Sequence, residues 1–184
     1  PLFAAFVDET LNRLRGPFLA HHPPKQVLTY LEEAFRFSLE RITPIKTELR
    51  KRSPKGMSVL VSMDDQPFII DTLRLFVRGC DADQLGGFNL VFRAVRDENG
   101  RLLEVGTEKG RPESLVMHET DVGGMVDIEA ANLILRRNLE HARAMVADFK
   151  SMTRSVERFV EKCEILADRR PDQSEGMRET AAFL

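Results

Sequence analysis

The residues best placed to do chemistry are Asp64, Asp65, Gln66, Pro67 and Phe68, which separate a short apolar run from a helical pattern. Free backbone N–H groups and the helix dipole at a helix N-terminus can receive a carboxylate or another anion. Two interpretations stay open. Either this segment binds a ligand, or it caps the helix through Asp65 or contacts another domain. The two acidic side chains would oppose an anion, which favours the second interpretation.

Motifs for other kinds of chemistry are missing from the sequence. It contains neither GxGxxG nor GxxxxGK[ST], so we expect no nicotinamide or nucleotide cofactor in this chain. It also lacks the GxSxG nucleophile elbow. The histidines and cysteines have no metal-ligand spacing, so we expect no metal site. Cys80 and Cys163 are expected to be reduced, because a domain of this size needs no disulfide. We therefore expect no catalytic residue in this chain.

The composition argues against two classes of partner. The chain has 184 residues, of which 27 are Lys or Arg and 29 are Asp or Glu, giving a net charge of −2. That balance disfavours a nucleic-acid partner, which requires a cationic surface. No window approaches the ~18 consecutive apolar residues of a membrane span. The low cysteine content and the lack of a signal peptide indicate a cytoplasmic protein, and Pro1 in place of an initiator Met indicates a piece of a longer chain.

The pattern of apolar residues divides the chain into three regions. Residues 1–50 form an N-terminal helical segment, residues 56–168 an α/β domain, and residues 169–184 a polar linker. The basic run 50–56 connects the first two regions. In the α/β domain we expect a strand over 57–63 and then a helix from Pro67 to Gly79. A hairpin should follow, with strands over 88–96 and 101–106 and a turn at Asp97–Gly100. A strand over 114–120 and a helix over 127–168 complete the domain. This order, β-α-β-β-β-α, predicts an α+β fold with N-terminal helices and a long C-terminal helix.

The long helix has a repeat of its own. Between Leu135 and Leu166 apolar residues recur about every 3.4 residues, close to the heptad repeat of a coiled coil. A helix over 127–168 would span roughly 63 Å, whereas a compact domain of this size has a radius of gyration near ~16 Å. We therefore expect the helix to protrude, to break, or to pack on another helix. The N-terminal helices and a second copy of the chain are the obvious partners.

Several motifs, in this order, resemble those of one family. The run from Val61 to Thr72 (VSMDDQPFIIDT) is similar to the "dDmPFLvDS" signature of the large bacterial NAD-specific glutamate dehydrogenases. The later matches to that family are Val95–Gly100 to its "RD..G" hairpin, Glu113–Glu119 to "ES..H.E", Val146–Met152 to "V.DW..M" and Glu179–Leu184 to the start of "e...FLrWL". The chain departs from the family at residues 86–89 (GGFN), where a histidine-proline pair is missing, and at Phe149, which replaces Trp.

The resemblance implies an N-terminal, ACT-like regulatory region of a very long enzyme that oxidises L-glutamate to 2-oxoglutarate and ammonia with NAD. The catalytic and NAD-binding residues of that family lie downstream, outside this chain. ACT domains bind amino acids or pair with each other through the loop after their first strand, which Asp64–Phe68 match. The order expected here departs from the ACT order, β-α-β-β-α-β, because no strand follows the long helix.

The implied partners are the downstream domains, further copies of the chain and an amino-acid effector. A free-standing ACT-type sensor or dimerisation module is the alternative function.

Overall fold

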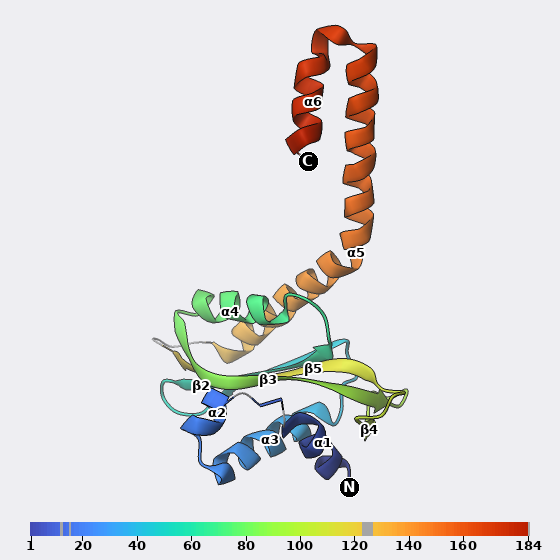
Figure 1. The fold of residues 1–184 in the computed structure, drawn as a ribbon. Helices are drawn as coiled ribbons and strands as arrows, with labels where there is room; N and C mark the ends of the chain where they lie inside the picture. Colours follow the sequence, from blue (N-terminus) through green and yellow to red (C-terminus); the bar gives the residue numbers. More distant parts are fainter. Residues whose placement is uncertain (12, 15, 123–126, 184) are drawn as a thin grey trace. The chain divides into compact units, whose positions relative to one another are not determined.

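A five-stranded antiparallel sheet is the centre of the first part of the chain, and helices cover both of its faces (Figure 1). The computed structural model describes residues 1–11, 13–14, 16–122 and 127–183. Leu184, the last residue of the motif that begins at Glu179, lies outside them. The strands are β1 (Ile45–Lys51), β2 (Gly56–Asp64), β3 (Ala82–Arg96), β4 (Leu102–Val105) and β5 (Arg111–Val122).

The sheet has the order β1-β2-β5-β3-β4, and every neighbouring pair is antiparallel. The two central strands, β2 and β5, pair in the register Val61↔Val116. Both faces of β2 are covered, which explains why its sequence is a continuous apolar run with two small Ser residues rather than an alternating one. β3 pairs with β5 from Ala82 to Ala94, but it meets β4 only over Ala94–Arg96.

Two hydrophobic cores lie on opposite faces of this sheet. The helices α1 (Leu2–Leu11), α2 (Gly16–His21) and α3 (Pro24–Ser38) cover one face, and α4 (Ile69–Gly79) with the first part of α5 (Ile128–Arg169) covers the other. Successive residues of a strand point to opposite faces. Leu115 accordingly packs in the core under α1 and α3, while Val116 packs in the core under α4 and α5.

The expected order β-α-β-β-β-α is found from β2 to α5, so the α+β assignment is confirmed. The hairpin at Asp97–Gly100 and the end of a helix at Gly79 are confirmed as well. Asp127 accepts hydrogen bonds from the N–H groups of Glu129 and Ala130 (3.1 Å each), as expected of a helix cap.

Three expectations about local structure were wrong. The segment 1–50 is not wholly helical, because its end forms the edge strand β1. The sequence of β1 (IKTELRK) is rich in charged residues and so lacks the apolar pattern by which a strand is recognised. The basic run 50–56 is therefore part of a hairpin, in which the N–H of Arg52 donates to the carbonyl of Gly56 (2.8 Å). The tail 169–184 contains a short 3-10 helix, η1 (Pro171–Gln173), and the helix α6 (Ser174–Phe183) instead of a linker.

The chain consists of two compact units, residues 1–142 and 143–184, and α5 belongs to both. In the first unit the apolar stripe of α5 is buried at Leu135 and Leu139. In the second unit the same stripe is mostly exposed: Phe149 is 64% exposed and Phe159 is 52% exposed. Cys163 is buried. The heptad-like spacing thus continues beyond the residues that the sheet covers.

Candidate functional site

The segment Asp64–Phe68 links β2 to α4 and lies where expected, but the helix begins later than predicted. It starts at Ile69 rather than Pro67. Phe68 precedes it with a φ of 70°, a left-handed conformation that is unfavourable for a residue with a bulky side chain. The carbonyl of Phe68 accepts hydrogen bonds from the N–H (3.0 Å) and the hydroxyl (2.7 Å) of Thr72. These two bonds hold the strained turn against the first turn of α4.

Asp65 does not cap α4, so that interpretation was wrong. The N-terminus of α4 has no hydrogen bond from a capping side chain. Asp65 instead faces β5: its N–H donates to the carbonyl of Pro112 (3.0 Å), and its Oδ1 accepts a hydrogen bond from the hydroxyl of Ser114 (2.6 Å). The amide nitrogen of Gln66 is buried and has no partner among the described residues.

Asp64 joins a group of charged residues that we call the Glu113 cluster: Arg41, Asp64, Arg96 and Glu113. Glu113 is 2% exposed and lies between two guanidinium groups. Arg96 binds it with two donors (Nε to Oε1 2.8 Å, Nη2 to Oε2 2.8 Å), and Nη2 of Arg41 lies 2.9 Å from Oε1. The same Nη2 lies 2.6 Å from Oδ1 of Asp64. A buried carboxylate is tolerated only when it is paired in this way.

Strand register and one turn bring these residues together. Asp64 and Glu113 are cross-strand partners at the end of β2 and the start of β5. The N–H of Arg41 donates to the carbonyl of Gly100 (2.9 Å), and Nη1 of Arg96 donates to the same carbonyl (2.8 Å). Gly100 has a φ of 77°, and a Cβ there would lie 2.2 Å from the carbonyl oxygen of Arg41. Only glycine allows the hairpin to approach Arg41 this closely.

A surface depression of about 460 Å³ adjoins the Glu113 cluster. Its charged lining residues are four cations and four carboxylates: Arg41, Arg96, Lys109, Arg111, Asp64, Asp97, Glu98 and Glu113. The guanidinium groups of Arg41 and Arg96 are already bound to carboxylates, so the buried part of the cluster is close to charge balance. Chemically, the cluster is a network of ion pairs that joins β2, β3 and β5 to Arg41, which follows α3.

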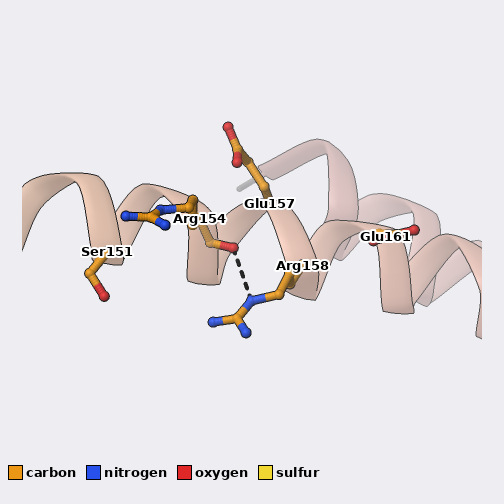
Figure 2. Close-up of a pocket in the computed structure, with 5 residues that line it drawn as sticks. All are labelled: Ser151, Arg154, Glu157, Arg158 and Glu161. Carbon is orange, nitrogen blue, oxygen red and sulfur yellow. Dashed lines mark hydrogen bonds between the residues drawn. The ribbon is translucent and has the colours of Figure 1, made fainter.

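A hollow on α5, the two cysteines and the possible metal ligands were compared with the Glu113 cluster. One hollow of about 440 Å³ lies on α5 and is lined by exposed polar residues of that helix alone, with Nε of Arg158 donating to the carbonyl of Arg154 (3.3 Å; Figure 2). Cys80 and Cys163 are both free thiols, and burial raises the pKa of Cys80, which disfavours a nucleophilic thiolate. Among the described residues no group of three or more His, Cys, Asp and Glu could hold a metal ion. Within that same part of the chain, no helix has both the length and the apolar character to cross a membrane.

Sequence reasoning found Asp64 and Asp65 but missed the partners that give them their roles. Arg41 follows a helix and belongs to none of the motifs, so no neighbouring residue indicated that it has a role in the site. Glu113 did carry a signal, because it is an acidic residue at the start of the buried run 113–118 within β5. Arg96 and Glu113 each belong to a motif, yet the sequence alone did not indicate that the two motifs meet.

The cluster therefore unites residues from three of the family-like motifs: Asp64 from the first, Arg96 from the hairpin and Glu113 from the last strand. Beside it, the hydrogen bond between Ser114 and Asp65 joins the first and the last of these motifs again. Comparisons of this chain with family models, with curated proteins and with solved structures found no match. The resemblance consequently stands on the motifs and on the positions of their residues.

Proposed function

We propose that this chain is a non-catalytic regulatory or assembly domain of a large, cytoplasmic NAD-dependent glutamate dehydrogenase, with an ACT-like fold. The parent enzyme would oxidise L-glutamate to 2-oxoglutarate and ammonia, and its NAD site would lie in downstream domains. The observation that carries this proposal is the convergence of the motif residues. Motifs that are up to about fifty residues apart in the sequence contribute Asp65 and Ser114, and Arg96 and Glu113, to contacts in one place.

The element order supports the ACT-like part of the proposal from β2 to β4, and departs from it at β5, which precedes the second helix instead of following it. An ACT order has a strand after its second helix, but the described residues after α5 contain only η1 and α6. An additional strand, β1, instead precedes β2 and pairs with its outer edge. β1 is thus the fifth strand of the sheet, and it comes from the segment before β2 rather than from a segment after the long helix.

The apolar stripe of α5 supports a role in assembly. Beyond Ala142 it exposes large side chains at heptad-like spacing, among them Phe149, Met152 and Phe159. Exposed apolar side chains at this spacing are typical of helices that pack on another helix. The downstream domains of the same chain and other copies of it are the partners that we propose.

The natural protein that carries this chain provides the test. We expect it to form NADH from NAD in a glutamate-dependent reaction, whereas the 184-residue chain alone does not. Glu113→Gln should reduce the activity of the natural protein together with its assembly, measured by sedimentation, while Glu104→Gln, at an exposed position of β4, should leave both unchanged. The proposal fails if the natural protein shows no glutamate-dependent NAD reduction.

A free-standing ACT-type amino-acid sensor is the second candidate. The depression beside the Glu113 cluster favours it, because the exposed Lys109 and Arg111 could bind an α-carboxylate and the exposed Glu98 an α-ammonium group. An amino acid at 100 times its dissociation constant should add about 2.7 kcal/mol to the free energy of unfolding. A thermal-shift series with the common amino acids measures this, and the absence of any shift removes the sensor function.

A further inference from the structure

A second pocket, of about 190 Å³, lies at the edge of β3 and is separate from the Glu113 cluster. Before Arg93 this edge of β3 is not paired with another strand of the described residues. The guanidinium of Arg13 donates to one of the edge carbonyls, that of Val91. The described residues that line the pocket are Arg13, Ile70, Arg74, Gln84, Gly87, Phe88, Asn89 and His118.

His118 supplies a buried polar atom that the rest of the described chain leaves unpaired. The residue is 4% exposed, and its Nδ1 has no hydrogen-bond partner among the described residues. Burial, with a smaller contribution from the charge of Arg74, lowers the pKa of His118 to about 4, so the ring is neutral at pH 7. A neutral imidazole can carry its proton on Nδ1 and donate it. The ring therefore lines the pocket without adding a charge to it.

Gly87 brings β3 close to β5 at this pocket. It is the cross-strand partner of His118, and both residues line the pocket. Its φ is 124°, and a Cβ at this position would lie 2.1 Å from the carbonyl oxygen of Met117 and 2.7 Å from the Cα of His118. The backbone geometry thus requires glycine here.

The charges at this pocket differ from those at the Glu113 cluster. Both charged lining residues are arginines, and no carboxylate belongs to the described lining. Glu9 binds Arg13 (2.7 Å) and Asp71 lies 3.7 Å from Arg74, but each guanidinium has five N–H donors and retains others for a ligand. Gln84 and Asn89 add amide groups that can donate as well.

We propose that this pocket binds a small oxyanion, a carboxylate or a phosphate, through the guanidinium groups of Arg13 and Arg74, with the ring of His118 in its wall. The volume suits an ion of this size and is below the roughly 300–1,000 Å³ of pockets for drug-sized ligands. Guanidinium groups bind both kinds of oxyanion with charge-assisted hydrogen bonds. This proposal does not depend on the function of the Glu113 cluster.

Isothermal titration of the 184-residue chain with inorganic phosphate, and separately with succinate, tests the proposal and identifies the source of the oxyanion. We expect saturable binding of at least one of them. Arg74→Gln should weaken that binding by about tenfold or more, because it removes a charge-assisted hydrogen bond. The matched control is Arg78→Gln, which removes the same charge from the exposed face of the same helix but not from the pocket, and should change the affinity less than about twofold.

His118→Gln, with the fold verified by circular dichroism, should weaken binding as Arg74→Gln does. Because Arg74 is exposed, its replacement leaves the fold intact, so the test does not depend on whether the His118 variant folds. An equal loss of affinity in the Arg74 and Arg78 variants would mean that only general charge attraction is measured, and would overturn the proposal. The absence of saturable binding of both anions to the unaltered chain would overturn it too.

Discussion

Two polar regions of the sheet domain differ in how their charges are balanced, although each contains one buried side-chain nitrogen without a partner among the described residues, Nε of Arg41 and Nδ1 of His118. In the Glu113 cluster, a buried carboxylate and two guanidinium groups bind one another, and Asp64 completes the group. At the β3 edge, a buried imidazole nitrogen is unpaired, and the charged lining residues are both arginines. The first arrangement stabilises the fold by itself, whereas the second leaves donors available for a ligand.

The difference shows that a charged cluster and a binding site need not coincide. The acidic segment 64–68 is the candidate binding segment of the sequence, but its two carboxylates bind residues of the protein itself, Arg41 and Ser114. The β3 edge contains no conspicuous motif, yet it combines excess positive charge with an unpaired donor. Measurements that separate stability from anion binding should therefore separate the two regions.

The largest effect should come from Glu113→Gln, which leaves the buried guanidinium group of Arg96 without a carboxylate and that of Arg41 with Asp64 alone. Breaking a buried ion pair from one side costs about 3–5 kcal/mol. Urea unfolding of the chain measures the free energy of unfolding. Glu98→Gln, an exposed neighbour in the same depression, should change it by less than about 0.5 kcal/mol. If Glu113→Gln lowered the free energy of unfolding by less than about 1 kcal/mol, the buried ion pairs of the Glu113 cluster would not stabilise the fold as we infer.

Gly87→Ala should cost at least about 3 kcal/mol, because the new Cβ would be strained at positive φ and would overlap the backbone of β5. The same unfolding experiment measures it. Gly79→Ala is the control, since nothing lies within 4 Å of a Cβ at the end of α4. A Gly87→Ala variant as stable as the unaltered chain would show that the close approach of the two strands is wrong.

The pH dependence of stability should reveal His118. Its pKa is about 4 in the folded chain and near 6.5 when unfolded, so the unfolded state binds more protons between these values. Stability should fall as the pH falls, by roughly 1.5 kcal/mol from pH 6.5 to pH 5, and His118→Gln should lack this part of the slope. An imidazole that titrates near pH 6.5 in the folded chain, measured by NMR, would argue against its burial.

The smallest effect on stability should come from Arg74→Gln. Its side chain is exposed and lies 3.7 Å from Asp71, a distance typical of a weak surface pair, so the free energy of unfolding should change by less than about 0.5 kcal/mol. The same variant should nevertheless bind the oxyanion at least about tenfold more weakly in the isothermal titration. A variant that is destabilised by several kcal/mol would assign Arg74 to the fold rather than to the pocket.

The sequence predicted the elements whose residue patterns are strong. The buried run of β2, the glycine after Asp97–Asn99 and the Asp127 cap each have a local signal, and each was located correctly. β1 was missed because an edge strand with alternating charges resembles a polar segment. The partners of Asp64 and Asp65 could not be predicted, since Glu113 and Ser114 reach them through sheet register and Arg41 through its hydrogen bond to the hairpin at Gly100. The β3-edge pocket depends on the meeting of Arg13, Arg74 and His118 from distant segments, which no sequence pattern shows.

One NMR titration with inorganic phosphate and succinate tests the contrast between the two regions most directly, because the arginine Nε–H and histidine ring signals report on both at once. We predict saturable shifts of His118 and Arg74, while Arg41 and Arg96, whose guanidinium groups are already bound to carboxylates, stay unshifted. Shifts of Arg41 and Arg96 with none at His118 would contradict the account.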